Sequence, residues 1–206
     1  MGLNVLGIAA SPRAKSNSTR LLQEALQGAA SVGTQTELIE LRTLKIAGCL
    51  ECNNCRQSGS CIIKDDFQLV LEKMLAADRI YFATPIFFMN VSAQAKLLID
   101  RCQCLWALKT VLKKAVPHTS SEPRLAMVIA VGGSKSLKMF DSVRWTVRSW
   151  LDVLNMTYAA GLYINQVDDA GDIEKHPTAI KEAFDLGRKV AQMGAPAEKP
   201  LEPELK

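Results

Sequence analysis

The sequence predicts a single domain of the doubly wound α/β class. Three observations support this prediction: five short apolar segments alternate with five segments of helical periodicity, most of the apolar segments are nearly continuous, and 48% of the 206 residues are hydrophobic. Such alternation indicates parallel strands joined by right-handed crossovers, and continuous apolar strands are typical of a sheet covered by helices on both faces. A chain of this size can bury one core.

The first half of the chain supplies two strands and two helices. Residues 3–10 form an apolar run that predicts a strand, and apolar side chains recur at helical spacing from Leu21 to Ala29. Residues 36–41 alternate polar and apolar side chains, which predicts a second strand. Residues 65–76 return to helical periodicity and predict a second helix.

The same alternation continues through the second half. In order, it predicts a strand at 79–84, a helix at 92–106, a strand at 124–131, a helix at 136–154, a strand at 157–164 and a helix at 177–193. No change of composition marks a boundary, so residues 1–194 are predicted to form one domain. Residues 195–206, rich in Pro and Glu, predict a tail that lies on the surface or frays.

Charge and hydropathy exclude several functional classes. The net charge of +4 comes from basic residues scattered along the sequence, which is not the footprint of a nucleic-acid-binding protein. No apolar run approaches the ~20 residues that span a bilayer, and no charged leader precedes the first apolar segment. We therefore expect a cytoplasmic protein without a membrane partner. In that compartment thiols stay reduced, which favours metal or redox chemistry for the six cysteines.

Four of the cysteines form a compact motif of spacing C-x2-C-x2-C-x5-C. They are Cys49, Cys52, Cys55 and Cys61. One curled loop can direct thiolates at these spacings toward a common centre, as iron-sulfur clusters and zinc sites require. Zinc loops usually present two separated C-x2-C pairs, but the spacing alone leaves zinc, a cluster and an empty loop open.

The other two cysteines, Cys102 and Cys104, fall in the predicted helix 92–106. About 200° separates positions two apart on a helix, so both side chains cannot face one metal there. We interpret them as structural or interface thiols.

Three loops follow strands 1, 3 and 4 of the predicted sheet. In doubly wound sheets, ligands bind outside the carboxyl ends of the strands, so these loops, 11–19, 84–90 and 132–136, are the candidate binding site. The first contains four hydroxyls, one amide and two cations just before a helix, a composition that suits a phosphate monoester as well as an ordinary helix cap. It has neither G-x-G-x-x-G nor G-x4-G-K-[ST], which argues against dinucleotide and P-loop sites.

Several motifs together resemble one known family. Ser11-Pro-Arg-x-x-Ser-Asn-Ser-Thr, the cysteine motif, Thr84-Pro85-Ile86-Phe87-Phe88 and Lys96-x3-Asp100-Arg101 are similar, in order and spacing, to the iron-sulfur flavoprotein branch of the NAD(P)H-dependent FMN reductase superfamily. The resemblance covers about residues 3–165. One departure is Ser16, where the family often has Gly. The resemblance implies a flavodoxin-like sheet of strand order 2-1-3-4-5, with a cysteine-rich insertion, 46–64, after strand 2.

The resemblance also implies cofactors and their ligands. FMN would bind through the three loops, with the phosphate on the first, the ring on the second, and a close backbone approach at the third. The implied FMN residues are Ser11, Arg13, Ser16, Asn17, Ser18, Thr19, Thr84, Pro85, Ile86, Phe87, Phe88, Asn90, Gly132, Gly133 and Ser134. A [4Fe-4S] cluster would be held by Cys49, Cys52, Cys55 and Cys61. No catalytic acid, base or nucleophile is expected, because the cofactors carry the chemistry.

The function implied is an FMN-dependent oxidoreductase or electron-transfer protein. Its donor would be ferredoxin or NAD(P)H, and its acceptors could include quinones, dioxygen or peroxide. Alternatives are an NAD(P)H-dependent FMN or quinone reductase without a cluster, a flavodoxin-like electron carrier that is not an enzyme, and a zinc-stabilised binding domain without flavin. The resemblance also implies a homodimer or homotetramer, in which the cysteine loop of one subunit lies near the FMN of another.

Overall fold

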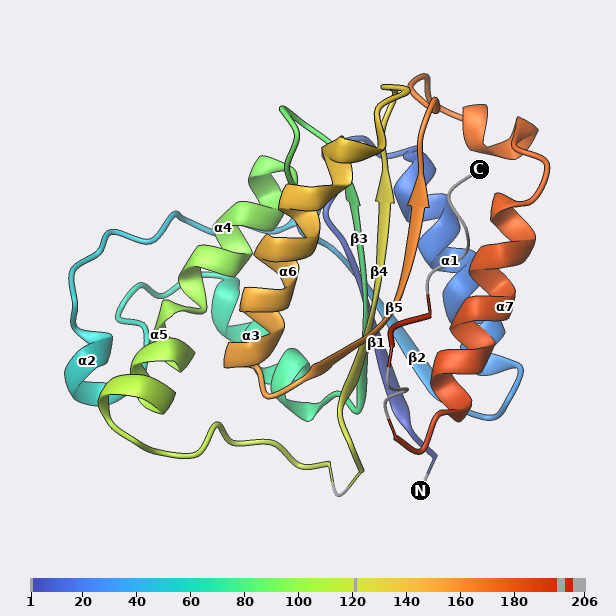
Figure 1. Cartoon of the computed structure of the whole chain (residues 1–206). Helices are drawn as coiled ribbons and strands as arrows, with labels where there is room; N and C mark the ends of the chain where they lie inside the picture. The colour runs from blue at the N-terminus through green and yellow to red at the C-terminus, as the bar shows by residue number, and fades with distance from the viewer. Residues whose placement is uncertain (1, 121, 196–198, 202–206) are drawn as a thin grey trace.

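The computed structural model describes residues 2–120, 122–195 and 199–201. Its centre is a sheet of five parallel strands in the order β2-β1-β3-β4-β5 (Figure 1). The strands are β1 (Asn4–Ala9), β2 (Gln35–Glu40), β3 (Arg79–Pro85), β4 (Leu125–Val131) and β5 (Thr157–Ile164). The predicted fold class and strand order are therefore confirmed, and each predicted strand lies within about two residues of its expected position.

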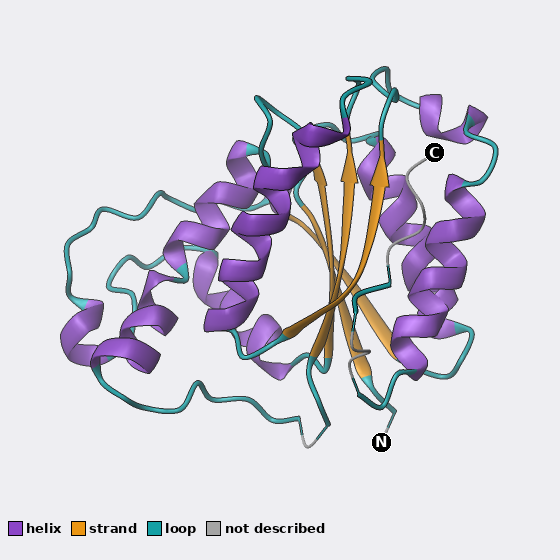
Figure 2. Cartoon of the chain, viewed as in Figure 1, coloured by secondary structure: helices purple, strands orange, loops and turns teal. Residues whose placement is uncertain are grey.

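Helices cover both faces of the sheet (Figure 2). One face is covered by α1 (Asn17–Ala30) and α7 (Ala179–Gln192), and the other by α3 (Phe67–Ala76), α4 (Ala93–Arg101) and α6 (Asp141–Val153). Two further short helices, α2 (Cys55–Ser58) and α5 (Gln103–Trp106), lie beyond the edge of this layer with the cysteine loop. Single turns complete the described chain at η1 (Leu41–Thr43), η2 (Ala107–Val111), η3 (Leu137–Phe140) and η4 (Asp172–Lys175).

Two predicted helices differ from the structure. The helix predicted at 92–106 is interrupted at Cys102, where ψ rises to 1° and separates α4 from α5. Hydrophobic periodicity does not register this break, because Leu98, Cys102 and Leu105 are buried on both sides of it. The helix predicted at 136–154 begins instead with the 3-10 turn η3 and becomes α-helical only at Asp141. Of the predicted tail 195–206, most residues lie outside those that the structure describes.

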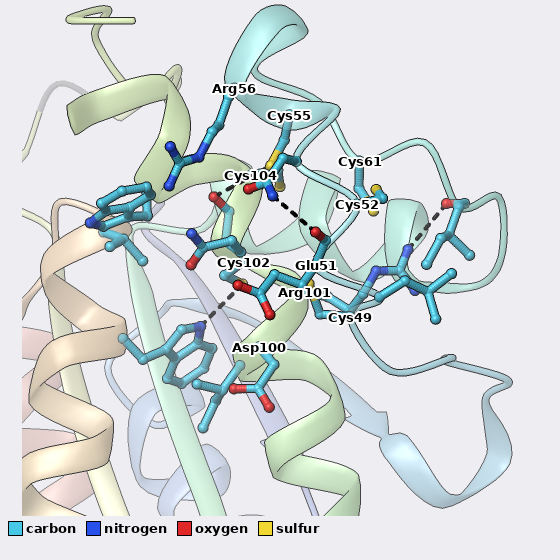
Figure 3. A pocket seen from close by; sticks show the side chains of 18 of the residues that line it. Cys49, Glu51, Cys52, Cys55, Arg56, Cys61, Asp100, Arg101, Cys102 and Cys104 are labelled. Carbon is cyan, nitrogen blue, oxygen red and sulfur yellow. Dashed lines mark hydrogen bonds between the residues drawn. The ribbon is translucent and has the colours of Figure 1, made fainter. Parts of the chain in front are cut away.

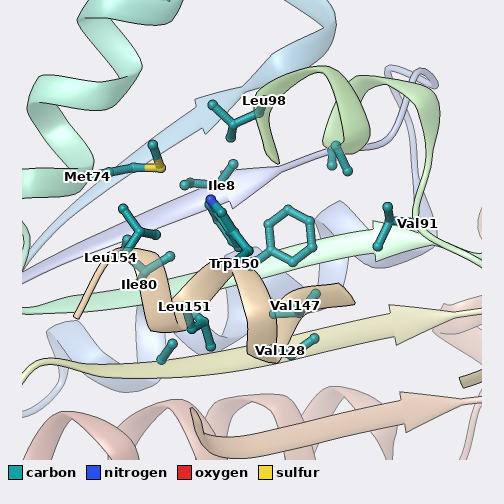
Figure 4. Packing of buried hydrophobic residues seen from close by; sticks show 14 of the residues in the cluster. Ile8, Met74, Ile80, Val91, Leu98, Val128, Val147, Trp150, Leu151 and Leu154 are labelled. Carbon is teal, nitrogen blue, oxygen red and sulfur yellow. The ribbon is translucent and has the colours of Figure 1, made fainter. Parts of the chain in front are cut away.

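Two apolar cores lie on opposite faces of the sheet. The core beneath α3, α4 and α6 is centred on Trp150, whose ring meets Phe82 edge to face at a centroid distance of 5.2 Å (Figure 4). Trp150 is 2% exposed and is surrounded by aliphatic residues, among them Ile80, Leu151 and Leu154. Burial of such a ring contributes about 3 kcal/mol or more, so this core fixes α6 against β3 and β4.

Two buried arginines close the amino end of the sheet. Arg79 donates to the carbonyls of Pro123, Val190 and Met193 at 2.8, 3.3 and 2.6 Å. Arg124 donates to the carbonyls of Met74, Ala77 and Leu154 at 2.5, 3.0 and 2.7 Å. Most of these carbonyls belong to the last turns of α3, α6 and α7, where a helix has unpaired acceptors and a negative dipole end. The arginines thus anchor three helices at the edge opposite the predicted ligand loops.

The crossing of α1 and α7 yields a prediction about stability. A Cβ atom at Gly187 would lie 2.1 Å from the carbonyl oxygen of Ala25, so the helices meet backbone to backbone at this point. We expect Gly187→Ala to lower the free energy of unfolding by about 1–3 kcal/mol, the usual range for overpacking, although alanine ordinarily favours helices. Urea denaturation measures the change. Gly194→Ala is the control, because no atom of the described residues, its chain neighbours aside, lies within 4 Å of its added Cβ; equal stability of the two variants would contradict the packing argument.

Candidate functional site

The three predicted loops meet at the carboxyl end of the sheet and enclose a cavity of about 50 Å³. Its lining comprises Ser11, Arg13, Ser16, Asn17, Ser18, Pro85, Ile86, Phe87, Val131, Gly132, Gly133, Val167 and Asp168. Ten of the fifteen predicted FMN residues are therefore gathered around one opening. Thr19, Thr84, Phe88, Asn90 and Ser134 lie in the same loops but do not line it.

The first loop, 11–19, which we call the phosphate loop, presents buried hydroxyls at the amino end of α1. Ser16 is the N-cap and its side chain accepts from the amide of Thr19 at 3.5 Å, while its hydroxyl lies 3.0 Å from that of Ser18. Ser11, Ser16 and Ser18 are all buried. Hydroxyl donors, free amides and the positive end of a helix dipole form a setting that fits a phosphate group.

A fourth loop completes the cavity and was not predicted. Val167 and Asp168, after β5, line it, and the segment is tied to the phosphate loop by side-chain hydrogen bonds. Arg13 Nη1 donates to the carbonyl of Asp168 at 2.8 Å, and Asn17 Nδ2 donates to that of Asp169 at 2.8 Å. Asn17 Oδ1 also accepts from the amide of Gly171 at 3.0 Å. In the sequence, the polar residues that follow the fifth strand were the signal that could have predicted this loop.

The second loop, 84–90, which we call the aromatic loop, contains a tight turn. Phe87 and Asn90 exchange two backbone hydrogen bonds of 2.9 and 3.0 Å, and both central residues have positive φ, 48° at Phe88 and 63° at Met89. Such angles are uncommon for bulky side chains. Phe87 faces the cavity, whereas Phe88 is fully exposed. Thr84 is buried and fixes the loop, since its hydroxyl accepts from the amide of Ser92 at 3.1 Å.

The cysteine loop borders a second and larger cavity of about 560 Å³ (Figure 3). All four cysteines of the motif line it, together with Cys102, Cys104, Trp106, Trp150 and polar residues of α4 and α6. Burial raises the pKa of the Cys55 thiol, and the nearby Cys49, Cys61 and Cys52 raise it further. The motif thus supplies the thiol number that a cluster needs. Within the described chain, however, no three His, Cys, Asp or Glu side chains converge as metal ligands.

The two remaining cysteines lie at the break between α4 and α5. Because the helix is interrupted at Cys102, the angular argument for a continuous helix does not apply, and both thiols border the same cavity. Burial raises the pKa of Cys102 to about 12 and that of Cys104 to about 11, so both stay protonated at neutral pH. The indole of Trp150 also donates to the sulfur of Cys102 at 3.3 Å. These properties agree with structural thiols.

Arg101 fastens the cysteine loop to the domain. Its buried guanidinium donates to both carboxylate oxygens of Asp65 at 2.8 and 3.2 Å, and to the carbonyls of Ala47 and Ile63 at 3.0 and 3.1 Å. It therefore holds both ends of the loop, 46–64. Burial lowers the pKa of Arg101, but the Asp65 carboxylate and the Cys61 thiol outweigh burial and raise that pKa. Arg101 was noted only as part of a family motif; its pairing with Asp65 across 36 residues of sequence could not be read from spacing.

Fold and site together define a flavodoxin-like α/β protein with a candidate ligand site at the strand ends and a cysteine loop beside the sheet. The chain belongs to the NADPH-dependent FMN reductase family, whose model matches residues 3–166. None of the helices in the described ranges combines the length and apolar character of a membrane-spanning segment.

Curated relatives include iron-sulfur flavoproteins, as the sequence resemblance predicted. One from Methanosarcina thermophila is 30% identical over 154 residues, which is 75% of each chain. Another, from Methanocaldococcus jannaschii, is 43% identical over 103 residues, 50% of this chain. The match spans only about half, 53%, of that relative.

Solved structures share the fold. The NAD(P)H:quinone oxidoreductase from Methanothermobacter marburgensis has a TM-score of 0.69 at 18% identity, covering 94% of this chain and 98% of its own. A flavone reductase has a TM-score of 0.63 at 23% identity, covering 92% and 62%. At these identities the likeness concerns the fold alone.

The ion pair of Asp65 predicts a pH-dependent stability. Burial raises the pKa of Asp65, but hydrogen bonds from Arg101, Ala47 and Phe67 outweigh it and hold the pKa below its usual value. The stabilisation is therefore complete at neutral pH and is lost as the pH falls below about 4. We expect Asp65→Asn to lower the free energy of unfolding by about 3 kcal/mol at pH 7, because it leaves a buried guanidinium without its counter-charge.

Urea denaturation at pH 7 and at pH 3 measures this effect, and limited proteolysis of 46–64 reports loosening of the loop. The difference between wild type and variant should shrink at pH 3. Asp66→Asn is the control, because Asp66 accepts from the Lys45 amide at 2.7 Å but has no arginine partner among the described residues, so its cost should be about 1 kcal/mol. A pH-independent difference would count against the ion pair as the cause.

Proposed function

We propose that this protein is an FMN-dependent oxidoreductase that holds a [4Fe-4S] cluster in its cysteine loop and passes electrons between a reduced donor and FMN. The observation that carries the proposal is that Cys49, Cys52, Cys55 and Cys61 all border one cavity in a chain of this family. Relatives named iron-sulfur flavoproteins support the same assignment.

The residues of the carboxyl-end cavity would bind FMN. Ser11, Ser16 and Ser18 would donate hydroxyls to the phosphate, and Arg13 would add a charged donor. Phe87 would pack against the flavin ring, close to Gly132 and Gly133, where the missing side chains let a flat group approach the backbone. These roles follow from the lining of the cavity and from the family.

The cysteines would bind iron as thiolates, and cationic groups of the loop would offset their charge. The nearby Cys61 thiol helps to raise the pKa of Arg101, and Arg56 follows Cys55 directly. When bound, the cluster exchanges single electrons and FMN accepts one or two, so together they connect one-electron donors to two-electron acceptors. The chain itself supplies binding and orientation.

The donor in this proposal is ferredoxin or NAD(P)H, and the acceptors are quinones, dioxygen or peroxide. The active form would be a homodimer or homotetramer in which the cysteine loop of one subunit lies near the FMN of another. A second candidate is an NAD(P)H-dependent FMN or quinone reductase without a cluster. It is favoured by one observation, that the described thiols do not converge as metal ligands.

The spectrum and iron content of the protein purified without air test the cluster. We expect a broad visible shoulder over flavin bands and about four iron atoms per chain. Cys49→Ala or Cys55→Ala should abolish the shoulder, because each removes a ligand, while Cys104→Ala should keep it. Flavin bands without iron would favour the second candidate, and a colourless zinc protein would refute both. Turnover with NADPH and with reduced ferredoxin then separates a reductase from a carrier.

Substitution of Ser18 tests the phosphate site independently of iron. A hydrogen bond to a charged group contributes about 1.5–3 kcal/mol, so Ser18→Ala should weaken FMN binding roughly ten- to a hundredfold. Fluorescence titration with FMN measures the dissociation constant. Ser31→Ala is the matched control, since Ser31 caps the other end of α1 and donates to the carbonyl of Gly28 at 2.6 Å. Unchanged affinity of Ser18→Ala would remove Ser18 from the site.

A further inference from the structure

The two outer strands of the sheet differ in how their free edges are protected. Strand β2 contains two glutamates, and Glu37 forms an ion pair with Lys73 of α3. Strand β5 contains no charged residue and no proline, and every residue after Thr157 is buried. Charges and prolines are the usual means by which an edge strand avoids pairing with another chain. The edge of β5 therefore needs protection from outside its own sequence.

A piece of the C-terminal segment lies on the outer edge of β5. The amide of Leu201 donates to the carbonyl of Ala159 at 2.8 Å, and the amide of Gly161 donates to the carbonyl of Leu201 at 2.9 Å. These two bonds form a parallel bridge between Leu201 and Ala160. Leu201 thus takes the place of a sixth parallel strand, and Figure 1 shows it in dark red beside β5.

The backbone of β5 is irregular at the point where Leu201 binds. Tyr158 pairs with Ala126 and Ala160 pairs with Met127, so Ala159 is an extra residue that has no partner in the β4 ladder. Such a bulge leaves backbone groups of the extra residue unpaired. Because the carbonyl of Ala159 accepts from Leu201, the segment supplies a donor that the sheet does not.

The side chain of Leu201 adds an apolar contact to these hydrogen bonds. It is half-buried and packs against the core between the sheet and helices α1 and α7. A contact of one residue is nevertheless small, and small contacts at the end of a chain open more readily than the core. The segment therefore covers the edge in competition with any other strand that could pair there.

The composition of the segment suits a cover that does not itself attract a strand. Residues 195–206 include three prolines, at positions 196, 200 and 203, and three glutamates. Pro200, directly before Leu201, has no amide hydrogen to offer to a further strand, and Lys199 is exposed. The charges and prolines that β5 lacks are thus present in the segment that covers it.

We propose that the outer edge of β5 is a strand-pairing surface, which the segment around Leu201 covers in competition with a second copy of this chain. The partner strand is the β5 of that copy, because two uncharged apolar edges pair antiparallel when a twofold axis relates them. While Leu201 is bound, the Ala159 carbonyl and the Gly161 amide are occupied, so this pairing is blocked. The inference does not require FMN or a cluster.

Leu201→Pro in the full chain tests the surface, because proline removes the amide that donates to Ala159 and keeps an apolar side chain. Hydrogen exchange followed by NMR measures the Gly161 amide, which should exchange at least about tenfold faster than in the wild type. Light scattering measures the assembly mass, which should rise with concentration to about twice that of the wild type. Comparison with the wild-type mass makes the test independent of the assembly proposed above.

Lys199→Pro is the matched control. Lys199 is two residues away in the same segment, is exposed, and makes no backbone hydrogen bond to another residue of the described chain. This variant should keep the wild-type mass and the wild-type exchange of Gly161. If it changed both as much as Leu201→Pro does, the effect would come from altering the segment in general, and the proposed surface would be wrong.

The double variant L201P/T157K identifies the surface that associates. Thr157 is the exposed first residue of β5, and a lysine on an edge strand opposes its pairing. We expect the double variant to return to the wild-type mass while its Gly161 amide still exchanges rapidly. Association that persists in the double variant would place the contact elsewhere and overturn the proposal.

The two readouts also give the remaining outcomes. Unchanged exchange of Gly161 in Leu201→Pro would show that Leu201 does not cover the edge. Faster exchange at the wild-type mass would show that the uncovered edge does not pair with a second copy. Either result refutes the strand-pairing surface and leaves the proposed function intact, because iron and FMN content report on that function alone. Far-ultraviolet circular dichroism of each variant confirms that the domain remains folded.

Discussion

The cysteine loop depends on one buried guanidinium. Arg101, at the end of α4, binds the carboxylate of Asp65 and the carbonyls of Ala47 and Ile63, so a single side chain satisfies both ends of a loop that has little regular structure. A loop of this length cannot bury enough apolar surface to order itself. Its position relative to the sheet is therefore set by a charged contact with four hydrogen bonds, whose bidentate geometry also fixes its orientation.

The same use of arginine organises the opposite edge of the sheet. Arg79 and Arg124 bind carbonyls at the ends of three helices, where backbone acceptors would otherwise be buried without donors. With the amino end closed in this way, the carboxyl ends of the strands remain available for irregular loops. Those loops carry the candidate ligand groups, as parallel α/β sheets generally allow.

Helix α6 contacts both the aromatic loop and the cysteine cavity. Thr146 of α6 lines the cysteine cavity, and its hydroxyl donates to Asn90 Oδ1 in the aromatic turn at 3.3 Å. One turn earlier, Ser142 donates to the carbonyl of Met89. Trp150 anchors the same helix in the core. A rigid element thus joins the turn that borders the candidate flavin site to the wall of the cysteine cavity, and this favours a fixed spacing between them.

The sequence by itself determined the five strands, the three ligand loops and the cysteine motif, because these depend on local periodicity and on residues near in sequence. It did not determine that Phe88 points to solvent while Phe87 faces the cavity, since backbone angles at the turn decide this. The break at Cys102, the loop of Val167 and Asp168, and the pairing of Asp65 with Arg101 likewise came only from tertiary structure. The loop and the ion pair join residues distant in sequence, which leave no periodic signal, and the break is hidden because buried residues continue on both sides of it.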